Sequence, residues 1–187
     1  MAQNWARSVR WRAWDGEGLE HLELFTTDIG RIVAESVVIG ARGGVPYGLR
    51  YRIECDDGWR VREVEAAVAG GARIHLRADG RGNWTDGTGR ALPDLAGCID
   101  VDIAATPFTN TLPIRRLNLA EGQARDIRLA YVPLPHLEVE PVAQRYTCLE
   151  KGRRYLYEGL FRRFQGELHV DADGLVLDYP DTFKRVH

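Results

Sequence analysis

The sequence predicts an all-β, mainly antiparallel fold: a sandwich, roll or barrel. Through most of the chain, apolar residues recur at every second position, which is the period of a strand with one buried face. Gly, Pro or Asp stands at most joints between these runs, at the close spacing typical of antiparallel sheets. Only residues 109–119 offer a good helical candidate, so a fold of alternating βαβ units is not expected.

Three consecutive strands are predicted in the first half of the chain. Residues 47–55 alternate strictly between apolar and polar side chains and end in the turn sequence DDG. The next strand begins at Trp59 and runs to residue 68, but its apolar parity changes near Arg62 and Glu63, which predicts a β-bulge. Residues 72–78 form the third strand, and the glycine-rich segment 79–90 is expected to hold one or two turns.

The rest of the chain predicts further strands and one short helix. The helix, within residues 109–119, has Asn110 or Thr111 as its N-cap and Pro113 in its first turn, where a missing N–H is harmless. The other predicted strands are residues 4–14, 19–27, 32–39, 99–103, 127–132, 137–139, 145–149, 155–159, 167–170 and 175–179.

Composition excludes several classes of protein. A chain of 187 residues fits a single domain, residues 1–187, and its net charge of -2 with interleaved charges provides no basic stripe for nucleic acid. The three cysteines are widely spaced, which argues against a disulfide framework and against a zinc site. The sequence shows neither a secretory signal nor a run of 18 apolar residues, so we expect a cytoplasmic protein without an integral membrane segment.

No catalytic motif stands out. Ser8 and Ser36 are the only serines, and neither lies in the GxSxG motif of serine hydrolases. The five histidines lack metal-ligand spacing, and the glycines around Trp84 lack phosphate-binding spacing. We therefore predict no catalytic residue, no metal and no cofactor.

Two groups of residues remain as candidate sites. Asp100 and Asp102 lie one pleat apart on the same strand face, as paired carboxylates of a glycosidase would, although a solvated strand face is the favoured explanation. The second group is aromatic and forms either ordinary core or the lining of a cavity. Its members are Tyr47, Tyr51, Trp59, Phe108, Tyr131, Tyr146, Tyr155 and Tyr157.

Four segments together resemble the bacterial putative glycolipid-binding family over nearly the whole chain. They are TPFTNTLPIRRL at residues 106–117, the preceding GCIDVDI, DGRGNW around Trp84, and GLVLDYPDTFKR at residues 174–185. The resemblance implies a spiral β-roll, in which a many-stranded sheet winds about a single helix. Leu112, Ile114, Leu117 and Leu119 are then the candidates for the buried side of that helix.

The resemblance also implies a function: a non-enzymatic protein that holds a glycolipid or another amphipathic molecule in an apolar cavity of the roll. The oligomeric state is not predicted. Two alternatives stay open, a sugar or lipid-ester hydrolase that uses Asp100 and Asp102, and a structural or interaction domain without a ligand. The polar residues expected to orient a ligand are Asp100, Asp102, Thr109, Asn110, Arg115 and Arg116. Those expected to line its site are Tyr47, Tyr51, Trp59, Trp84, Phe108, Tyr131, Tyr155 and Tyr157.

Overall fold

A computed structural model of the chain describes residues 5–161 and 163–187, and within them fourteen strands form one continuous sheet. The first seven strands follow one another across the sheet as antiparallel neighbours. They are β1 (Ala6–Ala13), β2 (Leu19–Thr26), β3 (Ile32–Arg42), β4 (Val45–Cys55), β5 (Val61–Val68), β6 (Arg73–Ala78) and β7 (Trp84–Asp86).

The second half of the chain starts at the opposite edge of the sheet and returns toward β1. After a short 3-10 turn (Pro93–Leu95), β8 (Asp100–Ile103) forms that edge. A second 3-10 turn, η2 (Phe108–Asn110), and the helix α1 (Thr111–Leu117) connect β8 to its parallel neighbour β9. The strands that follow are β9 (Ala124–Val132), β10 (Glu140–Glu150), β11 (Arg154–Gly159), β12 (Phe164–Val170), β13 (Val176–Tyr179) and β14 (Phe183–Arg185).

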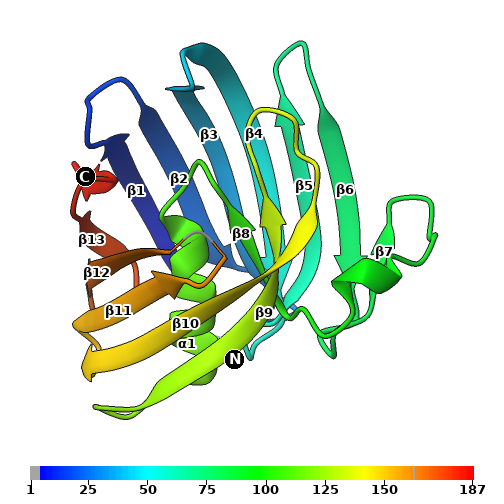
Figure 1. The fold of residues 1–187 in the computed structure, drawn as a ribbon. Helices are drawn as coiled ribbons and strands as arrows, with labels where there is room; N and C mark the ends of the chain where they lie inside the picture. The colour runs from blue at the N-terminus through cyan, green and yellow to red at the C-terminus, as the bar shows by residue number, and fades with distance from the viewer. Residues whose placement is uncertain (1–4, 162) are drawn as a thin grey trace.

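The sheet curls into an open roll. Strand β14 pairs with β1, so the first and last strands lie side by side in the middle of the sheet, while β7 and β8 remain as its two edges. The two halves of the sheet face each other across α1, which lies between them (Figure 1). The predicted all-β, mainly antiparallel fold around one short helix is therefore confirmed, with a sheet that does not close.

The helix contributes to two hydrophobic clusters. Leu112 is fully buried in the larger one, with Phe108, whereas Ile114 and Leu119 pack in a second cluster with aromatic residues of β10 and β11. Leu117 is only half-buried and packs against the second cluster. The largest fully buried side chains pack mainly in the larger cluster. They include Trp11, Leu22, Leu24, Leu49, Tyr51, Ile53, Phe108 and Leu112.

Several local predictions can be compared with the structure. The β-bulge is confirmed: Glu54 pairs with Glu63 and Cys55 with Val61, which leaves Arg62 as the extra residue. Trp59, however, has φ 62° and lies in the turn before β5, so the strand begins later than predicted.

The strand predicted at residues 137–139 is wrong. Leu137 has φ 56°, a left-handed conformation that extended backbone does not adopt. It lies in a loop with its side chain buried. The alternating apolar residues in this short run pack a loop against the core and do not form a hydrogen-bonded strand. Strand β14 was not predicted, and β7 is a short strand inside the glycine-rich segment that was assigned to turns.

The helix is shorter than the predicted 109–119. Pro113 lies in its first turn as expected, and Asn118 ends it with φ 44°. Asn110 occupies the N-cap position without making a side-chain cap, because its side chain bonds Tyr146 and the Pro107 carbonyl. Asn4, the first residue of the strand predicted at residues 4–14, lies outside the described residues.

Two further expectations concern cysteines and membranes. The wide spacing of the three cysteines argued against a disulfide framework. In the structure Cys55, Cys98 and Cys148 are free and buried. Among the described residues, no helix is long and apolar enough to cross a membrane.

Shortening the side chain of Leu112 in α1 should destabilise the whole roll. Leu112→Ala removes a fully buried side chain from the central cluster and should lower the free energy of unfolding by about 3 kcal/mol, measured by urea denaturation. The matched control is Leu177→Ala on β13, where the side chain is 37% exposed and the expected loss is about 1 kcal/mol or less. Equal losses in the two variants would contradict this role of the helix.

Candidate functional site

An aromatic cavity of about 300 Å³ opens at one end of the roll, beside the N-terminal end of α1. We call it the mouth cavity. Six parts of the chain meet there: the end of β8 with the loop that follows it, the end of β9, the end of β11, the start of β12, the β13–β14 turn and the β3–β4 hairpin. Its lining comprises Arg42, Asp102, Ile103, Ala104, Thr106, Asn110, Tyr131, Tyr157, Gly159, Phe161, Phe164, Tyr179, Thr182 and Phe183.

Two groups of aromatic rings, packed in tilted and edge-to-face contacts, form the aromatic walls. Tyr157, Phe164 and Tyr179 pack in a triangle with ring centroids 6.1 to 6.2 Å apart. Tyr131 and Phe161 form a separate pair with centroids 5.3 Å apart. Phe161 and Phe164 are 37% and 44% exposed, so these two rings make an apolar rim where the cavity meets solvent.

The polar part of the cavity comes from β8 and from the turn that follows it. Asp102 Oδ1 accepts a hydrogen bond from Thr109 Oγ1 (3.1 Å), and its Oδ2 accepts one from Gln144 Nε2 (2.7 Å). Asn110 Oδ1 accepts a bond from the Tyr146 hydroxyl (2.9 Å). These contacts fix the orientation of the carboxylate and amide before any ligand arrives, which lowers the entropic cost of binding.

The turn itself is set by Thr106. Its Oγ1 accepts the backbone N–H of Phe108 (3.0 Å) as η2 begins, and it lies 3.2 Å from the Tyr51 hydroxyl on β4. The side chain of Thr106 thereby joins the helical segment to the other half of the sheet. Threonine at this position both starts the turn and lines the mouth cavity.

Asp100 and Asp102 do not face one common space. Asp100 is fully buried, and Arg116 binds both its oxygens, with Nη2 2.6 Å from Oδ2 and Nε 2.9 Å from Oδ1. Burial raises the pKa of Asp100, and the Arg116 guanidinium offsets part of that rise. The prediction of a solvated strand face is wrong because the helical segment covers it, and the geometry gives the hydrolase alternative no pair of carboxylates at one site.

A second polar group lies inside the roll at Glu20 on β2. Its Oε1 accepts hydrogen bonds from the Ser36 hydroxyl (2.8 Å) and the Tyr51 hydroxyl (2.6 Å), whereas its Oε2 has no partner among the described residues. Burial raises the pKa of Glu20 to about 7, against the hydrogen bonds that lower it. Glu20 and Tyr47 both line a recess of about 40 Å³.

The predicted site residues therefore divide between several places. Asp102, Asn110, Tyr131 and Tyr157 line the mouth cavity, Thr109 bonds Asp102 beneath it, and Tyr47 lines the recess. Tyr51 is fully buried and bonds Glu20.

The other predicted residues lie elsewhere. Trp59, Arg115, Arg116 and Tyr155 line a separate crevice at the C-terminal end of α1, where the Arg115 guanidinium carbon stands 4.9 Å from the centroid of the Trp59 ring. Trp84 is buried and donates its indole N–H to the Cys98 carbonyl, 2.8 Å away, and Phe108 belongs to the core. Arg115 and Arg116 are close to Asn110 in the sequence, but they lie in the last turn of α1, at the opposite end of the helix from Asn110.

Sequence reasoning missed the residues that only the curled sheet brings together. They are Glu20, Ser36, Arg42, Thr106, Gln144, Phe161, Phe164, Tyr179 and Phe183. One signal was available for two of them: Glu20 and Gln144 are polar residues at positions where strand alternation requires an apolar, inward-facing side chain.

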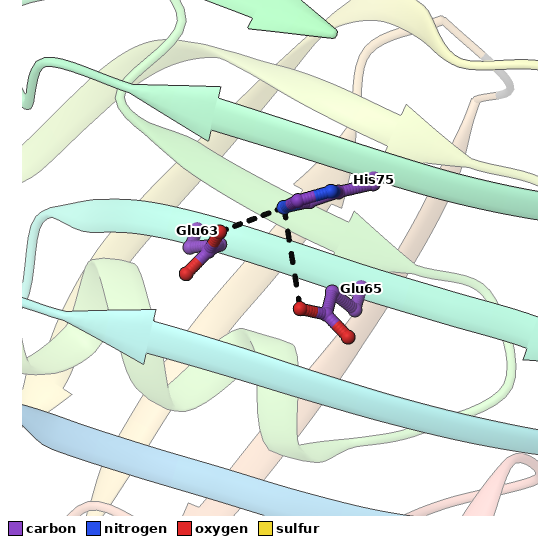
Figure 2. A group of neighbouring side chains, drawn as sticks. All are labelled: Glu63, Glu65 and His75. Carbon is purple, nitrogen blue, oxygen red and sulfur yellow. Dashed lines mark hydrogen bonds and ion pairs between the residues drawn. The ribbon is translucent and has the colours of Figure 1, made fainter. Parts of the chain in front are cut away.

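One cluster on the outer surface has the composition of a metal site. Figure 2 shows His75 of β6 facing Glu63 and Glu65 of β5, with Nε2 2.7 Å from Glu63 Oε1 and 4.0 Å from Glu65 Oε1. Carboxylate and imidazole are zinc ligands. However, Arg77 Nε also donates to Glu63 Oε1 (3.1 Å), and its cation competes with a metal ion, so cross-strand ion pairing accounts for the cluster.

Comparisons with known proteins cover nearly the whole chain. A family model described as "Putative glycolipid-binding" matches residues 8–185. A solved structure of a DUF1089 family protein from Pseudomonas aeruginosa is 42% identical, with a TM-score of 0.79, and the match covers 91% of this chain and 92% of that chain. No curated protein matches the chain.

The stability of the protein should depend on pH through Glu20. An unperturbed glutamate titrates near 4.5 and folded Glu20 near 7, so the folded state retains this proton longer and loses stability as pH rises between these values. Glu20→Gln removes that loss. The difference in unfolding free energy between the variant and the wild type should grow in the variant's favour by about 3 kcal/mol from pH 4.5 to pH 8, measured by urea denaturation.

The matched control for this prediction is Glu23→Gln, also on β2, where the side chain is 51% exposed. That variant should follow the wild type with pH. A Glu20→Gln variant that also runs parallel to the wild type would contradict the assignment.

Breaking the buried ion pair should cost more than replacing it. Arg116→Met leaves the Asp100 carboxylate buried without its cation and should destabilise the fold by about 3 to 5 kcal/mol in urea denaturation. The double variant Asp100→Val with Arg116→Met removes both charges, and it should recover more than half of that loss. A double variant as unstable as the single one would show that the pair is not the cause.

Proposed function

The chain belongs to the putative glycolipid-binding family that its sequence resembles, and from this premise we propose that it acts as one domain that binds an amphipathic molecule with a neutral sugar head in the mouth cavity. The observation that carries the proposal is the combination of aromatic walls with a preoriented carboxylate and amide in a single cavity. Apolar walls with a few fixed polar groups are typical of small-molecule sites.

The volume of the cavity supports binding of the head and not of a complete lipid. About 300 Å³ is the lower end of the range for small-molecule sites, roughly 300 to 1,000 Å³. Large side chains such as Trp11 and Leu112 are fully buried inside the roll, so the proposal places no long acyl chain there. In this proposal, the apolar part of the ligand lies on the exposed rim formed by Phe161 and Phe164.

The distribution of charge favours a neutral head over a phosphate. Arg116 is neutralised by Asp100, and Arg115 lies in the separate crevice at the other end of α1. Both charge types line the mouth cavity, since Asp102 and Arg42 are present. Asp102 suits sugar hydroxyl groups, because a carboxylate accepts the hydrogen bonds that hydroxyls donate.

Titration calorimetry with octyl β-D-glucoside, kept below its micelle-forming concentration, tests the proposal. We expect saturable binding of one molecule per chain, weakened about fivefold by Phe164→Ala, which removes exposed apolar wall without disturbing the core. Asp102→Asn should weaken it about tenfold, because the carboxylate becomes a poorer acceptor.

The control variant is Arg115→Ala, at the other end of the helix, which should leave the affinity unchanged. Absence of binding by the wild type would contradict the proposal and favour a structural domain. Affinity that is lost in Arg115→Ala and kept in Phe164→Ala would move the site to the crevice at the C-terminal end of α1.

A further inference from the structure

The Glu20 carboxyl group is costly to the fold and only half satisfied. Its side chain is 2% exposed, and its Oε2 has no hydrogen-bond partner among the described residues although its Oε1 has two. An unsatisfied buried polar atom destabilises the folded state, because it loses its hydrogen bonds to water and gains none in return. A glutamine or an apolar side chain at this position would avoid the charge, so packing alone does not explain the glutamate.

The unpartnered oxygen belongs to a residue that borders a space of suitable size. The recess holds about 40 Å³, and a site needs roughly 10 to 15 Å³ to hold one water-sized group. Glu20 lines it with Trp11 and Val38, its direct neighbours across β1 and β3. The Tyr47 ring, which forms one wall of the recess, lies against Gly40. A Cβ atom on residue 40 would come within 2.9 Å of the Tyr47 hydroxyl oxygen, so glycine leaves room for the ring.

The recess adjoins the mouth cavity. Phe183 lines both spaces, and the chain between Ala104 and Thr106 passes from one to the other: Ala105 borders the recess, and the residues on either side of it border the mouth cavity. Thr106 also contacts Tyr51, which bonds Glu20. A ligand in the mouth cavity thus lies beside the network that holds this carboxyl group.

We propose that the recess is a hydrogen-bonding subsite of the mouth cavity, in which Oε2 of Glu20 binds one hydroxyl group of the sugar head. The inference rests on the proposed function and adds to it the residue that selects a hydroxylated ligand. A hydroxyl group both donates and accepts, so it pairs with the carboxyl group in either protonation state. A hydrocarbon in the same place would leave the oxygen unsatisfied, which is the basis of strong discrimination in polar sites.

The experiment uses two probes with the same octyl chain and six-membered ring: octyl β-D-glucoside, and octyl tetrahydropyranyl ether, which lacks the hydroxyl groups and the hydroxymethyl carbon of the sugar. At pH 8, Glu20→Met should weaken binding of the glucoside at least about tenfold, because the thioether side chain offers the sugar hydroxyl group no strong hydrogen-bond partner. It should leave binding of the ether unchanged within about twofold. Glu23→Gln, with an exposed carboxyl group on the same strand, should bind both probes like the wild type.

A second measurement does not depend on the variant's folding. The glucoside should move the carboxyl carbon-13 resonance of Glu20 in the wild-type protein and leave that of Glu23 in place. Binding of the glucoside with no change at Glu20, in either measurement, would overturn the subsite while the proposed function stands. A wild-type protein that binds neither probe would overturn both.

Discussion

The structure depends on the burial of a helix that is too short to be stable by itself. Seven residues, Thr111–Leu117, form α1, whereas isolated helices shorter than about 12 to 15 residues are marginal in water. Tertiary contacts must therefore hold it. The segment bonds both halves of the sheet: Thr106 contacts Tyr51 of β4, Asn110 accepts from Tyr146 of β10, and Thr111 donates to the Gly174 carbonyl, 2.9 Å away, before β13.

The same contacts that fix the helix also shape the mouth cavity. Asp102 and Asn110 have to point inward to bond Thr109, Gln144 and Tyr146, and in doing so they form the polar part of the cavity. The bonds that hold the helical segment and those that shape the mouth cavity thus belong to one hydrogen-bond network. Glu20 joins this network only through Oε1, which accepts from Tyr51, because its Oε2 has no partner among the described residues.

Local sequence patterns predicted most of the fold, because a strand's period and its turns are properties of neighbouring residues. The bulge at Arg62 was visible as a change of parity, and Pro113 located the first turn of the helix. The run at residues 137–139 misled because three alternating residues suit a packed loop as well as a strand. The buried environment of Asp100 could not be predicted, since it requires the position of Arg116 in space.

The candidate site was predicted only in part, for a similar reason. Asp102, Asn110, Tyr131 and Tyr157 border the mouth cavity, and their part in binding stays a prediction. The family resemblance and the aromatic pattern gave no means of separating them from Trp59, Trp84 or Tyr155. The curl of the sheet brings β3, β8, β11 and β13 to one end of the roll, and no pattern within a single strand records that curl.

The pairing of β1 with β14 has a consequence for how the molecule is made. While the chain is being synthesised, β2 to β7 can add to β1 one hairpin at a time, yet the second edge of β1 stays open until the final strand has emerged. Closing that distant contact carries a large loop entropy, which places it late in folding. Until β14 pairs with it, that edge of β1 presents unpaired backbone N–H and C=O groups, which can pair with a strand of another chain.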